Sequence, residues 1–137
     1  MINIIKTDYG FSMEFIGNIN RSDVEDLLSR CVDEFEDVHN KFAMMIDFRR
    51  CDYLAASAKK TLDSARRVFY HQGMRRSIMI FRDANMARGF QKAAKQLGFD
   101  RFERYLAAAA PDVNQKALDW LLRAVDPDKA HTVEQVC

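Results

Sequence analysis

The sequence predicts a single α/β domain with a mixed, mostly parallel sheet, and two observations support this fold class. Short apolar runs alternate with longer segments in which apolar residues recur every three or four positions, as expected for strands joined by helices. The chain has 137 residues, 48% of them hydrophobic and 30% charged, which is enough for one substantial core. The predicted order is β-β-α-β-α-β-α-β-α. Because parallel strands need crossover helices, we expect only the opening hairpin to be antiparallel.

The first elements are a hairpin and an amphipathic helix. Residues 2–5 and 11–16 alternate or cluster apolar residues on either side of a turn at Tyr9-Gly10. Ser22 and Glu25 have the spacing of a capping box, which predicts that a helix starts there. Its apolar residues recur at helical spacing and predict an inward face made of Val24, Leu27, Leu28, Cys31, Phe35 and Val38.

The middle of the chain predicts two buried strands around a second helix. Residues 42–48 are apolar until a charged turn, Asp47-Phe48-Arg49-Arg50. Residues 57–71 have helical period and end before Gly73, with Ala58, Leu62, Ala65, Val68 and Phe69 facing inward. Residues 77–81 then form a second strand that is apolar on both faces, which is typical of the centre of a parallel sheet.

The last third predicts helix, strand and helix. Asp83 or Asn85 caps a third helix that ends at Gly98-Phe99, a pair typical of a left-handed C-cap with its hydrophobic contact. Residues 102–106 form the last strand. Asp112 is the predicted N-cap of a final helix, whose inward face includes Trp120 and Ala124. The domain is expected to span residues 1–125, with a polar tail at 126–137.

Several function classes lack their sequence signals. The three cysteines are widely spaced without a C-x-x-C, and no His, Cys or carboxylate cluster has metal-ligand spacing, so neither a metal nor another cofactor is expected. No glycine-rich phosphate loop or nucleophile elbow occurs, and Asp47 with Asp52 lacks a base or nucleophile, so we expect no enzyme. No transmembrane run or signal peptide is recognisable, which favours the cytoplasm. A pI near 7.7 without a recognition motif argues against nucleic acid.

Charge is distributed unevenly along the chain. Residues 1–48 carry 4 basic and 10 acidic side chains, a balance of −6. Residues 49–104 carry 14 basic and 5 acidic side chains, a balance of +9. Such polarity either steers a charged partner or coats the outer faces of different helices.

The segment around residues 44–58 resembles the STAS domain, the fold of anti-sigma factor antagonists and of the cytoplasmic tails of sulphate transporters. In that family a strand ending in Asp-Leu is followed by an apolar pair and then by Asp-Ser-Ser-Gly at a helix start. Here Met44-Met45-Ile46-Asp47-Phe48 is similar to the strand, Tyr53-Leu54 to the pair, and Ala55-Ala56-Ser57-Ala58 to the last four. Ala87-Arg88-Gly89-Phe90 and Leu97-Gly98-Phe99-Asp100 resemble the family's third helix and its exit. Three of the four motif residues are alanine, and the serine that phosphoswitch members phosphorylate corresponds to Ser57.

The resemblance implies a non-enzymatic regulatory module that binds a protein, such as a kinase-like anti-sigma factor. On this hypothesis Ser57 is the phosphorylation candidate, and a phosphate there turns partner binding off. The expected partner-binding residues are Arg49, Arg50, Asp52, Tyr53, Lys59 and Lys60, of which the four basic ones could also hold the phosphate. The alternative interpretation of Ser57 is an ordinary helix N-cap.

A second hypothesis is a binding module without a phosphoswitch. Its basic face would hold an anionic ligand, a lipid head group or an acidic partner through Arg66, Arg67, Arg75 and Arg76. The opening strand is also a plausible sheet edge, which leaves a homodimer open.

Overall fold

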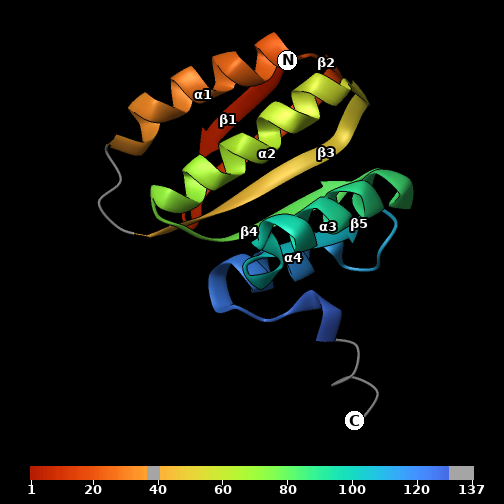
Figure 1. Ribbon diagram of the computed structural model, residues 1–137. Helices are drawn as coiled ribbons and strands as arrows, with labels where there is room; N and C mark the ends of the chain where they lie inside the picture. The colour runs from red at the N-terminus through yellow and green to blue at the C-terminus, as the bar shows by residue number, and fades with distance from the viewer. Residues whose placement is uncertain (37–40, 130–137) are drawn as a thin grey trace, which may run out of the picture.

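The computed structural model describes residues 1–36 and 41–129 and confirms the predicted order of elements (Figure 1). The strands are β1 (Ile2–Lys6), β2 (Gly10–Ile19), β3 (Phe42–Leu54), β4 (Met74–Phe81) and β5 (Glu103–Ala107). The helices are α1 (Arg21–Glu36), α2 (Ala56–His71), α3 (Ala84–Leu97) and α4 (Val113–Arg123). A short 3₁₀ helix, Phe99–Arg101, precedes β5.

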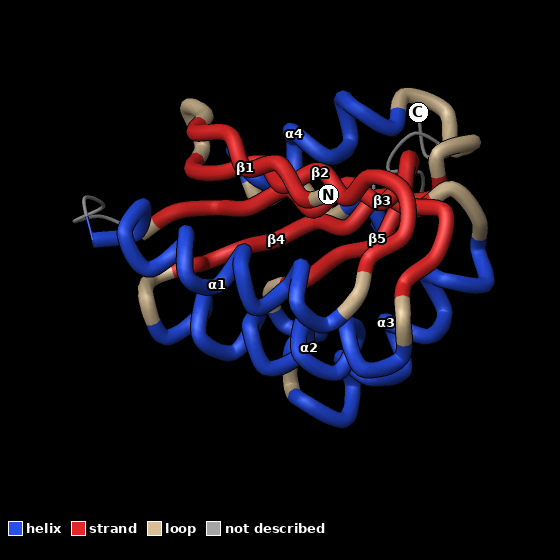
Figure 2. The backbone as a smooth tube through the Cα atoms, turned by 90° about the horizontal axis from the view of Figure 1, so that it is seen from above, coloured by secondary structure: helices blue, strands red, loops and turns tan. Residues whose placement is uncertain are grey.

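The five strands form one mixed sheet in the order β1-β2-β3-β4-β5. As predicted, β1 and β2 pair antiparallel, whereas β3, β4 and β5 each join their predecessor in parallel. Helices α1, α2 and α3 cover one face of the sheet and α4 lies on the other, so that the domain has three layers (Figure 2). The strand β1 is an edge of the sheet, in agreement with the sequence.

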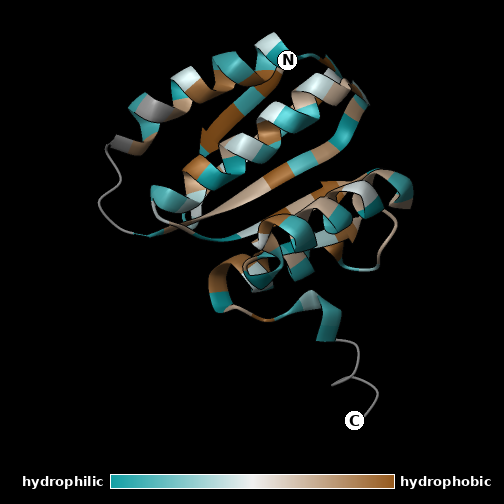
Figure 3. Ribbon diagram, in the orientation of Figure 1, coloured by the Kyte–Doolittle hydropathy of each residue, from teal (hydrophilic) through white to brown (hydrophobic). Residues whose placement is uncertain are grey.

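Two apolar cores hold these layers together. The larger lies between the sheet and helices α1–α3, where the ring of Phe48 is 4.6 Å from that of Phe15 and stacks on Phe81 at 5.1 Å. The smaller lies under α4, where Trp120 packs and its indole Nε1 donates to the carbonyl of Ser77 at 2.9 Å. Helices α1 and α2 alternate between hydrophilic and hydrophobic colours along their length, as amphipathic helices on a sheet should (Figure 3).

The start of α1 differs from the predicted capping box by two residues. The amide of Asp23 donates to Oδ1 of Asn20 at 3.0 Å, and the amide of Asn20 donates to Oδ2 of Asp23 at 2.9 Å. The prediction of Ser22 with Glu25 is therefore wrong, because Asn20 and Asp23 form the reciprocal pair two residues earlier. Val38 lies outside the described residues. At α3 the predicted cap is confirmed, since Asp83 accepts from the amides of Asn85 and Met86.

Strand β3 is longer than predicted and passes through the expected charged turn. Phe48 and Cys51 both lie in the larger core, although residues three positions apart in a regular strand point to opposite faces. Arg49 and Arg50 lie between them, and the register with β2 shifts at this point, which identifies a β-bulge. The turn prediction failed because Asp47 and Arg49 neutralise each other on the same face, so that the strand carries charge without ending.

Two smaller expectations change, and the predicted N-cap of α4 is confirmed in position only. Val68 does not face inward but is 44% exposed on α2. Asp112 occupies the cap position of α4 in a left-handed conformation (φ 54°), and its side chain makes no capping hydrogen bond in the described structure. Ala124 follows the end of α4 with φ 57° and is exposed rather than inward-facing.

At its other end the described chain continues past α4. Nε of Arg104 on β5 lies 3.0 Å from Oδ1 of Asp126, the first residue of the predicted tail. Within residues 1–36 and 41–129, no helix combines the length and apolarity required to cross a bilayer, and no group of three potential metal ligands comes together.

Candidate functional site

The junction between β3 and α2 places the predicted switch residue. β3 ends at Leu54, Ala55 is extended with φ −60° and ψ 146°, and α2 begins at Ala56. The amide of Ala55 donates to the carbonyl of Ile19 at 3.0 Å, which fixes the junction to the end of β2. The start of α2 is thus held at the carboxyl ends of two parallel strands, where α/β sheets usually bind ligands.

Ser57 is the second residue of α2 and its side chain is exposed. The N-cap is Ala55, and in the described structure no side chain caps this helix. The interpretation of Ser57 as an N-cap is therefore wrong. Its hydroxyl is not committed to the helix, and only its carbonyl is engaged in the described contacts, accepting from Oγ1 of Thr61 at 3.0 Å.

A groove of ≈ 400 Å³ surrounds Ser57 between the start of α1 and the exposed side of α2. It contains two cations, Lys60 of α2 and Arg21 of α1, with the hydroxyls of Thr61 and Ser64. Nε of Arg21 lies 2.6 Å from the carboxylate of Glu25, and both side chains of this ion pair are exposed. Sequence reasoning missed Arg21, because only the packing of α1 beside α2 brings position 21 to position 57.

Two of the predicted partner-binding residues lie on this same end of the sheet. Asp52 and Tyr53 are exposed in the last residues of β3, and the Tyr53 side chain is 62% accessible. Arg82, the residue directly after β4, donates to the carbonyl of Cys51 at 2.8 Å and lies 3.5 Å from Asp52. The hydrogen bond from Arg82 therefore holds in place the end of β3 that carries the exposed Tyr53.

Arg49 and Arg50 lie on the opposite face of the sheet from α2. Nη2 of Arg49 is 2.9 Å from Asp47, and its Nη1 donates to Asn114 of α4 at 3.2 Å. The hydrogen bond with Asp47 raises the pKa of Arg49 above its ordinary value. Arg50 lies 3.6 Å from Glu14. Neither cation lines the Ser57 groove, so their predicted role in holding a phosphate is wrong.

Lys59 turns toward α3 instead of toward Ser57. Its Nζ is 3.3 Å from Asp63 and 4.8 Å from the ring centroid of Phe90. Of the four basic residues expected near Ser57, the structure brings only Lys60 into the groove.

The four arginines of the predicted basic face do not share a surface. Arg66 is fully buried, so its place on an anion-binding face is excluded. Arg76 is half-buried on the other side of the sheet and donates to the carbonyl of Leu121 at 3.1 Å. Arg67 and Arg75 are exposed, but they line separate depressions. Anion binding by these two exposed arginines stays a prediction.

Comparison with known proteins places the fold. No family model matches the chain, and no curated protein matches it in sequence. The anti-sigma factor antagonist SpoIIAA, in its unphosphorylated form, is similar in structure with a TM-score of 0.57 and 14% identity, covering 84% of this chain and 94% of SpoIIAA. An uncharacterised protein of the DUF3478 family from Shewanella loihica, described as having a SpoIIAA-like fold, gives a TM-score of 0.60 at 19% identity, over 88% of this chain and 92% of that one.

Both matches extend over nearly the whole described domain, and they agree with the mixed five-stranded sheet and its helical layers. At sequence identities of 14% and 19%, the structural similarity is evidence for the fold alone. The chain therefore has the α/β fold of SpoIIAA, which is the fold that the resemblance to the STAS domain implied.

Proposed function

We propose that this domain is a non-enzymatic regulatory module that binds a protein partner at the end of β3 and the start of α2. The docking surface consists of Asp52, Tyr53, Ser57, Lys60 and Arg21, which we call the β3–α2 surface. The observation that carries the proposal is the exposed Ser57 hydroxyl in a groove with two cations at the start of an uncapped helix. The fold of an anti-sigma factor antagonist supports the same role.

Phosphorylation of Ser57 would control that binding. A phosphate adds about −1.5 to −2 charges at pH 7, and the free amides and dipole of a helix N-terminus stabilise an anion. Arg21 and Lys60 line the same groove and offer counter-charges. The domain itself can therefore accept the phosphate, and the cost of the new charge falls on a partner docked over Ser57.

Tyr53 is the proposed anchor of the docked partner. Tyrosine offers a large apolar ring with a polar tip and is enriched at the centre of protein interfaces. Its high exposure in the free domain leaves that ring available for burial. The proposed class of partner is a kinase-like anti-sigma factor, which would both bind this surface and phosphorylate Ser57.

The test uses a kinase-like anti-sigma factor from the same source, incubated with the full chain and ATP. We expect one phosphate, mapped to Ser57 by mass spectrometry, and none on Ser57→Ala. Binding measured by calorimetry should weaken at least about tenfold in Ser57→Asp and in Tyr53→Ala. Ser64→Asp is the matched control, because it places the same charge in the same groove away from the start of the helix.

Two results would count against the proposal. If phosphate appears elsewhere and Ser57→Asp binds as well as the original chain, Ser57 is not the switch. If Tyr53→Ala also leaves binding unchanged, the β3–α2 surface is not the docking site.

A further inference from the structure

The free edge of β1 offers backbone groups that β2 does not use. Met1 and Ile16 exchange both hydrogen bonds, at 2.9 and 3.0 Å, and Thr7 does the same with Gly10 at 2.8 and 3.3 Å. Because hydrogen-bonded pairs alternate along an antiparallel ladder, the backbones of Asn3 and Ile5 face β2. The amide and carbonyl groups of Ile2, Ile4 and Lys6 therefore face outward.

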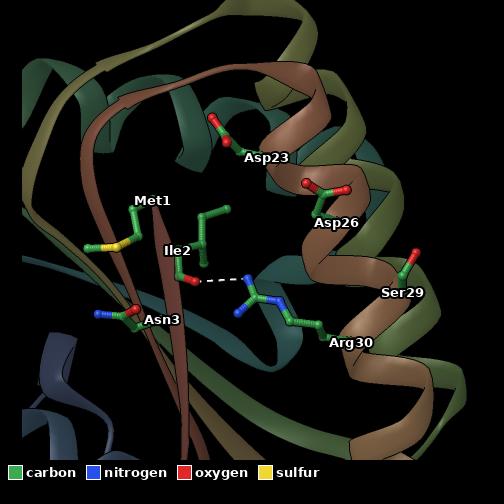
Figure 4. A pocket seen from close by; sticks show the side chains of 7 residues that line it. All are labelled: Met1, Ile2, Asn3, Asp23, Asp26, Ser29 and Arg30. Carbon is green, nitrogen blue, oxygen red and sulfur yellow. Dashed lines mark hydrogen bonds between the residues drawn. The ribbon is translucent and has the colours of Figure 1, made fainter.

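A broad groove of ≈ 810 Å³ lies between this edge and α1. Figure 4 shows Arg30 reaching from α1 to the strand, where its Nη2 donates to the carbonyl of Ile2 at 2.8 Å. The carbonyl of Ile2, at the beginning of the edge, is therefore already occupied by Arg30. The outward groups of Ile4 and Lys6 have no hydrogen-bond partner among the described residues.

The side of α1 that borders the groove is acidic. Asp23, Asp26, Arg30 and Asp33 follow the i, i+3, i+7, i+10 spacing that places residues along one side of a helix. Asp23 and Asp26 line the groove, and Asp26 and Asp33 are exposed. A strand added to β1 would lie beside this acidic flank, which we define as Asp23, Asp26 and Asp33.

We propose that the β1 edge and the acidic flank together accept an extended, lysine- or arginine-bearing segment of another protein as a sixth strand. Main-chain hydrogen bonds to Ile4 and Lys6 supply the pairing, and basic side chains facing α1 meet the carboxylates. A second copy of this chain is a poor occupant, since its own β1 would bring an identical acidic flank and residues 1–48 carry a balance of −6. This surface is separate from the β3–α2 surface and does not depend on it.

The probe is a short synthetic peptide of alternating valine and lysine, added to the full chain. Amide-resolved hydrogen exchange by NMR should slow at Ile4 and Lys6, whereas Asn3 and Ile5, already bonded to β2, should not change. The same peptide N-methylated at every residue has the same charge but has no backbone N–H donor on either edge, so it cannot pair as a strand. It should bind at least about tenfold more weakly.

Variants separate the two contributions. Lys6→Pro removes one outward amide without breaking the β1–β2 ladder, and it should weaken the peptide about tenfold relative to Lys6→Thr, which keeps the amide. Asp26→Lys with Asp33→Lys should also weaken it. Glu25→Lys makes the same charge change as Asp26→Lys alone. It lies about 100° around α1 from Asp26 and does not line the groove, so it should have less effect than that single variant.

Any one of three results would overturn the proposal. Unchanged exchange at Ile4 and Lys6 with saturating peptide, or equal binding of the N-methylated peptide, would mean that attraction is by charge alone. Concentration-dependent protection of the same two amides without peptide would assign the edge to a second copy. The peptide comparison uses the unaltered chain, so it is decisive even if Lys6→Pro fails to fold.

Discussion

Nε of Arg66 on α2 lies 3.2 Å from Oε2 of Glu103 on β5, and both side chains are fully buried. The guanidinium is also 3.3 Å from Asp63, and it lies 4.8 Å from the ring centroid of Phe99. The hydroxyl of Tyr105 donates to the other oxygen of Glu103. This ion pair therefore joins the helix that carries Ser57 to the far edge strand of the sheet.

Replacing one partner of this pair should be costly. Arg66→Met leaves Glu103 buried without its main counter-charge, and breaking a buried ion pair costs about 3–5 kcal/mol of unfolding free energy. Urea unfolding followed by circular dichroism measures the loss. Arg67→Met, one residue along on the exposed side of α2, is the matched control and should change stability by about 0.5 kcal/mol or less.

The double variant Arg66→Met, Glu103→Leu should recover much of that loss, because no charge is then left buried. Simple addition of the two single losses would show instead that the residues act independently.

Stability should depend on pH through Glu103. Burial raises the pKa of Glu103 above its ordinary 4.5, and the nearby Arg66 partly opposes the rise. A raised pKa in the folded state means that folding favours protonated Glu103. The stabilisation that this protonation gives is complete at a pH below the pKa of Glu103 in the unfolded chain, and it is lost as pH rises through the pKa in the folded chain. Relative to Glu103→Gln, which cannot titrate, the original chain should lose stability over that range.

The measurement is the unfolding free energy of both proteins from pH 4 upward in steps. A difference between them that stays constant with pH would contradict the raised pKa.

The two described cysteines should resist thiol reagents in the folded protein. Cys31 is 2% exposed and burial raises its pKa to about 12, while Cys51 is 1% exposed and its pKa is also raised by burial. Since the thiolate is the reactive form, neither should react with an aromatic disulfide reagent at pH 8 until the chain unfolds. A Cys137→Ser background removes the third thiol from the count. Rapid reaction of either remaining thiol in that background without denaturant would contradict the packing.

Gly10 and Gly89 should respond oppositely to alanine. Gly10 has φ 144°, and a Cβ there would collide with the backbone oxygen of Ala43, so Gly10→Ala should destabilise by about 2 kcal/mol or more. Gly89 lies within α3 with no atom within 4 Å of an added Cβ, so Gly89→Ala should stabilise by about 0.5–1 kcal/mol. Thermal unfolding of both variants tests this pair, and equal shifts in Tm would refute the account.

The order of elements could be predicted because local signals and global fold agree. Doubly apolar runs such as residues 77–81 mark the central strands, and Gly98 with Phe99 ends α3 in the left-handed conformation that was expected. The passage of β3 through Asp47 and Arg49 could not be predicted. Asp47 and Arg49 lie two residues apart on the same face of the strand and form an ion pair, and Arg49 also donates to Asn114 of α4, so the charges do not end the strand.

The candidate site was harder to predict than the fold. Adjacent basic residues look alike in a sequence, yet Lys59 turns to α3 while Lys60 lines the Ser57 groove. Arg66 and Arg67 separate in the same way, one into the core and one into solvent. Adjacent residues of a helix point in directions about 100° apart, so neighbouring side chains face different surroundings. Which of them faces the core depends on the rotation of α2 about its own axis, and that rotation is set by the elements that pack against it.

The sheet places every strand beside the one that precedes it in the chain. During synthesis from the N-terminus, each new strand therefore emerges when its neighbour is already available, and none has to be inserted between two others. The open side of the growing sheet moves from β2 to β5 as translation proceeds. Arg66 leaves the ribosome before Glu103, so its charge gains its buried counterpart only when the last strand arrives.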